Sequence, residues 1–138
     1  MWWVYAILSA FFASLTAIFS KLGVENINSN LATGIRTIVI LFMIWGIILF
    51  KGEARGMNAI PQKSVIFLVI SGLATGLSWL FYFKALQIGD VSKVAPIDKL
   101  SIALTVVLAI VFLGETLTWK TAIGARQIIA GTLVMIIK

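Results

Sequence analysis

Long apolar stretches constrain this chain more than any other feature of its sequence. Five of them follow one another, separated by short polar connectors, at residues 2–22, 31–50, 64–88, 93–113 and 119–137. A helix needs about 20 mostly apolar residues to cross a bilayer, and each stretch is of roughly that length. Hydrophobic residues make up 61% of the chain and charged residues 12%, against about 45–50% and about 25% in a water-soluble domain. We therefore expect an all-α membrane protein with five transmembrane helices in one domain, residues 1–138.

Two residue types that are missing narrow the choice of function. The chain has no Cys and no His, which excludes disulfides and thiol chemistry and removes the usual zinc sites and catalytic triads. No catalytic residue, metal site or cofactor is predicted, and an enzyme is disfavoured. The 11 Lys and Arg residues outnumber the 5 Asp and Glu residues, but they are spread singly along the chain. This pattern indicates topology signals and not a nucleic-acid surface.

The basic residues beside the spans do not select one orientation in the membrane. Each side receives four of them: Lys51, Arg55, Lys63 and Lys120 on the N-terminal side, and Lys21, Lys84, Lys93 and Lys138 on the other. Because orientation follows the Lys and Arg bias, a balanced chain is able to insert both ways. Two copies in opposite orientation would then form a ten-helix, two-fold assembly like the inverted repeats of transporters. One fixed orientation with a weak signal is the open alternative.

Polar side chains recur at helical spacing within four of the five spans. In lipid such side chains turn toward other helices or a wet cavity, so the spacing predicts four helices around a pathway, with the fifth span at its edge. Ser and Thr hydroxyls also bond backbone carbonyls or join helices, and that structural interpretation stays open for each of them. The residues are Tyr5, Ser9, Thr16 and Ser20; Thr33, Arg36 and Thr37; Ser71, Thr75, Ser78, Trp79 and Tyr82; and Asp98, Ser101 and Thr105.

Three charges are expected at a shared depth. Spans two and four start on the same side, and a rise of about 1.5 Å per residue places Arg36, Asp98 and Lys99 roughly 8–10 Å inside it. Asp98 is expected to pair with Arg36 or Lys99, because unpaired charges are costly in a membrane. Ionisable groups within spans often mark substrate routes, although a purely structural ion pair is the alternative. The predicted substrate-binding residues are Arg36, Thr75, Trp79, Tyr82, Asp98 and Ser101.

Pro96 is a candidate helix hinge. It lies in the first turns of the fourth span and has no backbone N–H, so it frees one carbonyl just before Asp98. The expected result is a loosened end of this helix.

The fourth span and its flanks carry an ordered set of motifs. Residues 85–96 read ALQIGDVSKVAP, residues 113–118 read LGETLT, and Gly124 and Gly131 follow in the last span. In this order and spacing the chain resembles the EamA-type branch of the drug/metabolite transporter superfamily, and the weaker match of spans one to three extends the resemblance over essentially the whole chain. Many members are largely uncharged just after the position of Pro96, where this chain has Asp98 and Lys99.

The resemblance implies an architecture and a transport function. Family members usually carry two five-helix repeats in opposite orientation around a central substrate cavity, whereas this chain looks like a single repeat. It thus implies an antiparallel homodimer in the inner cell membrane of a prokaryote, and export or exchange of small organic solutes.

Two functional hypotheses follow. The first is a secondary transporter working by alternating access, in which Arg36 and Asp98 contact a polar or zwitterionic solute and Trp79 and Tyr82 contact its apolar part. Whether Asp98 carries a coupling proton, or solutes exchange without one, stays open. The second is a non-transporting or half-transporter subunit that pairs with another membrane protein. The predicted partners are a small-molecule solute, the lipid bilayer and a second copy of the chain, with no nucleic acid.

Overall fold

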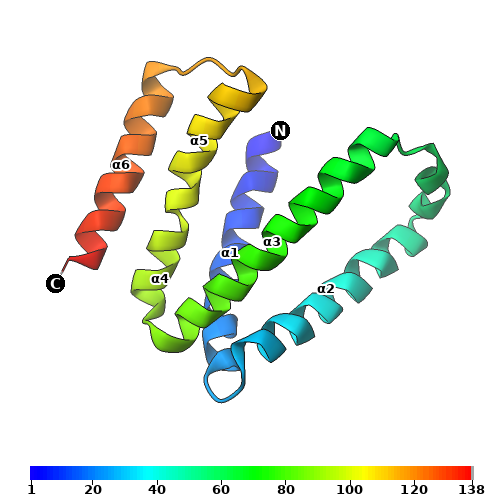
Figure 1. The fold of residues 1–138 in the computed structure, drawn as a ribbon, viewed down its shortest axis with the longest axis horizontal. Coiled ribbons are helices and arrows are strands. Elements are labelled where there is room, and N and C mark those ends of the chain that lie inside the picture. Colours follow the sequence, from blue (N-terminus) through cyan, green and yellow to red (C-terminus); the bar gives the residue numbers. More distant parts are fainter. Residues whose placement is uncertain (138) are drawn as a thin grey trace. The chain divides into compact units, whose positions relative to one another are not determined.

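The computed structural model describes residues 1–137. Lys138, which the orientation argument counts as one of the basic residues, lies outside the described residues. In chain order the helices are α1 (Trp2–Val24), α2 (Ser29–Phe50), the 3₁₀ helix η1 (Glu53–Ala59), α3 (Gln62–Ile88), α4 (Val91–Asp98), α5 (Leu100–Leu113) and α6 (Trp119–Ile136) (Figure 1).

Four segments are long and apolar enough to cross a membrane: α1, α2, α3 and the run Val91–Leu113 that contains α4 and α5. The first three lie close to the predicted spans, with α2 starting at Ser29 where residue 31 was expected. The predicted fifth span forms α6 but is not among these four. Lys120, Arg126 and Gln127 lower its apolar character, so the apolar criterion supports four crossings, and the fifth crossing stays a prediction.

The fourth predicted span is not one continuous helix. It is interrupted for one residue at Lys99, three positions beyond Pro96. The Lys99 N–H donates both to Ala95 O at 3.3 Å and to Pro96 O at 3.1 Å, and the Ile102 N–H donates to Lys99 O at 3.0 Å. The bonds to Pro96 O and Lys99 O each span three residues, so they tighten the chain into a 3₁₀-like turn. The predicted span over residues 93–113 therefore forms two helical pieces, α4 and α5, which together keep the length of one span.

The helices group into two compact units, Met1–Gln87 and Ile88–Lys138. In the first unit α1 and α2 diverge from the loop that joins them, and α3 runs back antiparallel to α2 (Figure 1). The buried residues of this unit come from the last turns of α1, the first turns of α2 and the last turns of α3: Ala17, Ser20, Val24, Ser29, Ala32, Thr33, Phe83 and Leu86. Its core therefore lies at the end where these three helices converge.

The second unit consists of α4, α5 and α6. Within it α6 packs along α5 and also contacts α4. Thr132 of α6 is buried, with 5% of its surface exposed. Its hydroxyl donates to Pro96 O at 3.3 Å, so α6 is attached to the proline-containing turn of α4.

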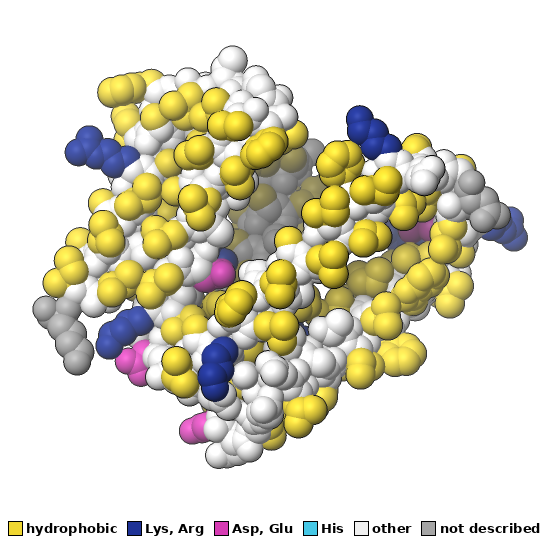
Figure 2. All heavy atoms as spheres, in the orientation of Figure 1, with side chains coloured by type: hydrophobic (Ala, Val, Ile, Leu, Met, Phe, Trp, Pro, Cys, Tyr) yellow, Lys and Arg dark blue, Asp and Glu magenta, His cyan; other side chains and the backbone are white. Residues whose placement is uncertain are grey.

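The helices leave most of their apolar side chains uncovered. Figure 2 shows these side chains along the helices of the visible face, with Lys and Arg side chains mostly toward helix ends. In water such exposure would be strongly unfavourable, because apolar surface is stabilised when it is removed from water. Lipid or further helices are therefore the surroundings that this surface fits.

Candidate functional site

Side-chain hydrogen bonds fix the end of the first unit where the helices converge. The Lys21 ammonium donates to Leu86 O at 2.6 Å. The Gln87 amide donates to Ile27 O at 2.8 Å and to Val24 O at 3.4 Å. Carbonyls at the end of a helix have no partner within it, so these bonds satisfy groups that would otherwise stay unpaired. They hold the C-terminal ends of α1 and α3 together.

A local cap sets the start of α2 in this region. Asn28 precedes the helix, and its side-chain oxygen accepts the backbone N–H of Asn30 at 2.8 Å. Asn is among the preferred residues at this position for that reason. Arg36 lies seven residues after Ser29, which is roughly 10 Å along the helix at about 1.5 Å per residue.

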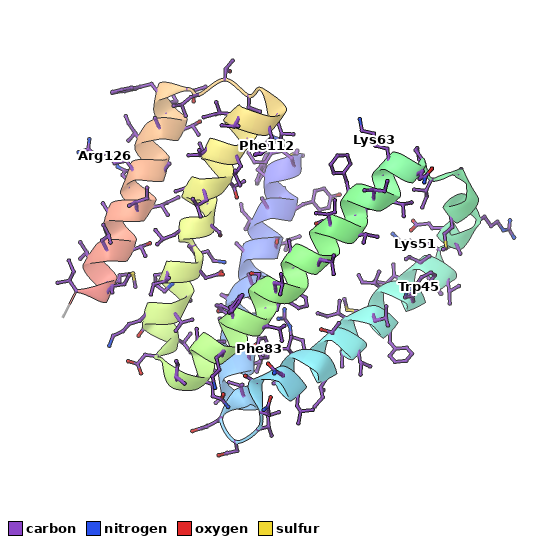
Figure 3. The ribbon with its side chains drawn as sticks, in the orientation of Figure 1. Trp45, Lys51, Lys63, Phe83, Phe112 and Arg126 are labelled. Carbon is purple, nitrogen blue, oxygen red and sulfur yellow. The ribbon has the colours of Figure 1, made fainter. Side chains whose placement is uncertain are left out.

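Arg36 lies over two aromatic rings of α3. Its guanidinium carbon is 4.0 Å from the ring centroid of Trp79 and 5.5 Å from that of Phe83. Both values fall within the range of about 6 Å for cation–π attraction. The two rings are four residues apart and so occupy one face of the helix. Phe83 is 3% exposed, and it projects from the part of α3 nearest the core, far along the helix from Lys63 (Figure 3).

A groove of about 600 Å³ opens beside this arginine. Arg36 is the one ionisable side chain among the described residues that line it, and Thr16 and Ser20 add two hydroxyls. The remaining wall is mainly apolar and includes three aromatic rings. The lining residues are Phe12, Leu15, Thr16, Phe19, Ser20, Gly23, Ile27, Ala32, Ile35, Arg36 and Phe83. A volume of about 300–1,000 Å³ with a mostly apolar wall and few polar groups is typical of small-molecule sites.

Several predicted hydroxyls bond their own helix. Thr75 donates to Ser71 O at 2.9 Å, Thr33 to Ser29 O at 2.9 Å and Thr37 to Thr33 O at 2.8 Å. Thr105 likewise donates to Ser101 O at 2.8 Å. In such a bond the hydroxyl proton is already donated, so only the oxygen remains available, as an acceptor. Thr75 is exposed on α3 and does not line the groove, so its part in binding stays a prediction.

Asp98 and Lys99 form an ion pair in the second unit. Lys99 Nζ lies 3.2 Å from Asp98 Oδ2. Lys99, one of the two partners that the sequence allowed, is therefore within ion-pair distance of Asp98. Ser101 is exposed in the first turn of α5, and Pro96 lies within α4, with its carbonyl accepting from Thr132.

A second groove lies within the second unit between α5 and α6, with a volume of about 520 Å³. Arg126 is the one ionisable side chain among its described lining residues, and every other lining residue is aliphatic. Unlike Arg36, Arg126 has no aromatic platform among those residues.

A comparison with known protein families assigns the chain to one of them. The EamA-like transporter family matches residues 1–137. The chain belongs to the EamA-like transporter family. It is a multi-pass membrane transporter, and members of the family are generally not enzymes.

Two relatives have the same extent as this EamA-like chain. A protein of Sinorhizobium sp., "Uncharacterized transporter in cobO 3'region", is 48% identical over 134 residues, which cover 97% of this chain and 95% of the relative. An uncharacterized protein of Methanocaldococcus jannaschii is 30% identical over 132 residues, covering 96% of this chain and 93% of the relative. No solved structure matches significantly.

In this EamA-like transporter the structure joins some of the predicted site residues and adds others. Arg36 and Trp79 meet directly, and Tyr82 is half-buried one turn further along α3. Phe83 was missed, although its spacing of four residues from Trp79 is a readable signal. The aromatic residues Phe12 and Phe19 of the groove gave no signal, since exposed aromatic residues in a span also face lipid.

Proposed function

We propose that this chain is a secondary transporter of small polar or zwitterionic organic solutes, and that it works by alternating access as an antiparallel homodimer in the inner cell membrane. The observation that carries the proposal is the groove beside Arg36. It combines an apolar wall, two hydroxyls and one fixed charge. Ionisable groups within membrane spans are expensive and therefore usually functional.

The dimer is supported by the length of the relatives and by the charge balance of this chain. Both relatives have about the same length as this chain, since the match covers more than nine tenths of each. A single unit of this size is thus the whole extent of those proteins. Transporters commonly place the substrate site at the interface of two inverted repeats. Two oppositely inserted copies would supply that symmetry, and the balanced Lys and Arg distribution is compatible with both orientations.

Transport by the purified chain alone is the direct test. The chain is reconstituted into proteoliposomes, and uptake of radiolabelled solutes is measured under an outward gradient of the same unlabelled solute. The solutes share one aromatic ring and differ in charge, from zwitterion and anion to neutral amide and cation. They are phenylalanine, 3-phenylpropionate, 3-phenylpropanamide and 3-phenylpropylamine. Saturable exchange of at least one probe, absent from empty liposomes, is the expected result.

The half-transporter hypothesis gives a different result. In that case the purified chain has no flux of any probe, a second membrane protein co-purifies in equal amount from the native host, and flux appears only when both are reconstituted. This outcome would replace the homodimer by a mixed pair.

A further inference from the structure

The charge of the groove points to the charge of its occupant. Arg36 contributes the one ionisable side chain to the groove. In the first unit, residues 1–87 as described, no Asp or Glu carboxylate pairs with it and no hydrogen bond from its N–H groups is present. There its guanidinium lies over the rings of Trp79 and Phe83, and Tyr82 is a further electrostatic neighbour. Aromatic rings attract the cation, but they do not neutralise it.

An arginine without a counter-charge is costly in an apolar environment. The guanidinium presents five N–H donors in a planar fork, and that fork matches a carboxylate through two parallel hydrogen bonds. An arginine that is positioned by aromatic rings keeps these donors available for a ligand. An anionic ligand would therefore supply both the missing charge and the missing acceptors.

The one acidic side chain predicted for the site has its own partner. Asp98 pairs with Lys99 at 3.2 Å, so the charge of this carboxylate is compensated within the second unit. Among the predicted site residues this leaves Arg36 as the charge without an oppositely charged partner in its own unit, which favours a net anionic ligand over a cationic one.

The rest of the groove sets the size and character of the ligand. Phe12, Leu15 and Phe19 of α1 line it together with Ile35 of α2. Burial of an apolar group against them is favourable by about 25 cal/mol per Å². The hydroxyls of Thr16 and Ser20 are within the same wall and are able to donate or accept hydrogen bonds.

We propose that the groove binds an organic carboxylate with an apolar, ring-sized body, with the Arg36 guanidinium on the carboxylate and the aromatic wall around the body. This inference rests on the proposed function because it names the substrate class of the same site. It narrows a polar or zwitterionic solute to one whose recognised group is a carboxylate.

Binding to the purified chain tests the substrate class without requiring transport. Isothermal titration calorimetry in a neutral detergent compares 3-phenylpropionate with 3-phenylpropanamide and 3-phenylpropylamine, which keep the ring and spacer but change the charge. We expect the carboxylate to bind about tenfold or more tightly than the other two, as charge-assisted hydrogen bonds allow. Equal affinities, or preference for the amine, would overturn the inference.

Three variants assign the preference to one arginine. Arg36→Gln should reduce carboxylate affinity to the level of the amide. Arg55→Gln removes the same charge from the exposed connector helix η1 and should leave the preference unchanged. Arg126→Gln should also leave it unchanged, and loss of preference in this variant instead of Arg36→Gln would place the anion in the groove between α5 and α6. Arg36→Lys keeps the charge without the planar fork and should retain part of the preference, which separates ligand recognition from a folding defect.

A lipid headgroup is the competing source of an anion at this site. The titration is repeated with phosphatidylglycerol or phosphatidylcholine added to the micelles. If phosphatidylglycerol abolishes carboxylate binding at a few molecules per chain and phosphatidylcholine does not, the arginine is a lipid site and the inference fails. Binding with the expected preference but without flux in proteoliposomes would contradict the transport proposal alone. Flux of the amine in preference to the carboxylate would contradict the substrate class alone.

Discussion

Arg36 combines a permanent charge with a location in a largely apolar helix. A lysine at this position would carry a compact, strongly hydrated charge, whereas a guanidinium is weakly hydrated and stacks on aromatic faces. Trp79 at 4.0 Å and Phe83 at 5.5 Å provide such faces. The two rings therefore position the guanidinium in the groove, and the proposed anionic ligand neutralises its charge.

Replacement of Trp79 tests this positioning role. We expect Trp79→Leu to weaken 3-phenylpropionate binding by roughly 2- to 30-fold, because cation–π contacts contribute about 0.5–2 kcal/mol. Trp79→Phe keeps a ring and should lose less. Binding affinity is measured by calorimetry, with Trp45→Leu as the control, since Trp45 lies elsewhere on α2 (Figure 3) and does not line the groove. Equal losses in the Trp79 and Trp45 variants would show that the effect is not local.

The elements of this fold differ in how much of them the sequence predicts. Helix positions follow from hydropathy because lipid requires about 20 apolar residues per crossing and every backbone group must be bonded within the helix. The interruption at Lys99 was anticipated only as a loosening at Pro96. Its location depends on which carbonyl the Lys99 N–H reaches, and on Thr132 binding Pro96 O. These are tertiary contacts, and the hydrophobic periodicity of the sequence does not predict them.

At the scale of side chains on those elements, the same limit applies. Spacing placed Arg36, Trp79 and Asp98 together as site candidates, yet it left the partner of Asp98 open between Arg36 and Lys99. Lys99 lies beside Asp98 because it follows it at the break between α4 and α5. The residues that line the groove could not be predicted either, because an aromatic residue that faces a groove and one that faces lipid occur at the same spacing in the sequence.

The bond between the ends of α1 and α3 should be a main source of stability in the first unit. Gln87→Leu removes the donor to Ile27 O and Val24 O. Leaving a partly buried carbonyl unpaired costs about 1–3 kcal/mol, so the free energy of unfolding should fall by that amount. Unfolding in mixed micelles of increasing SDS content measures it. Gln62→Leu, at the exposed start of α3, is the matched control and should be close to neutral.

The contact between α6 and α4 has a smaller expected effect. Thr132→Val keeps the shape of the side chain but removes the hydroxyl that donates to Pro96 O at 3.3 Å. Hydrogen bonds between helices in membranes average about 0.6 kcal/mol, and we expect a loss of that order in the same SDS unfolding measurement. Thr105→Val, whose hydroxyl bonds within its own helix, is the comparison. A loss larger for Thr105→Val than for Thr132→Val would contradict a specific role of α6 at the proline turn.

At the scale of the whole molecule, the proposed pair of oppositely inserted copies would reproduce the arrangement that transporters build from inverted repeats. The EamA-like family assignment covers nearly every residue, and the exposed apolar helices leave room for partners. What the family does not fix is the number of crossings and the orientation. Four segments meet the length and composition criteria, whereas five crossings are needed to put the two termini on opposite sides of the membrane.

A single labelling experiment distinguishes these arrangements, and the absence of native Cys removes background. Met57→Cys marks the connector helix η1, Ile137→Cys marks the C-terminal end, and both positions are exposed. An impermeant thiol reagent is applied to intact cells, with permeabilised cells giving the total. For an antiparallel dimer with five crossings we expect about half labelling at each position, because each copy presents one of the two sites outside. Complete labelling at one position and none at the other would establish a fixed orientation and exclude the antiparallel homodimer. Labelling that is complete at both positions, or absent at both, would mean that an even number of segments crosses between η1 and the C-terminal end. That result would contradict a fifth crossing by α6.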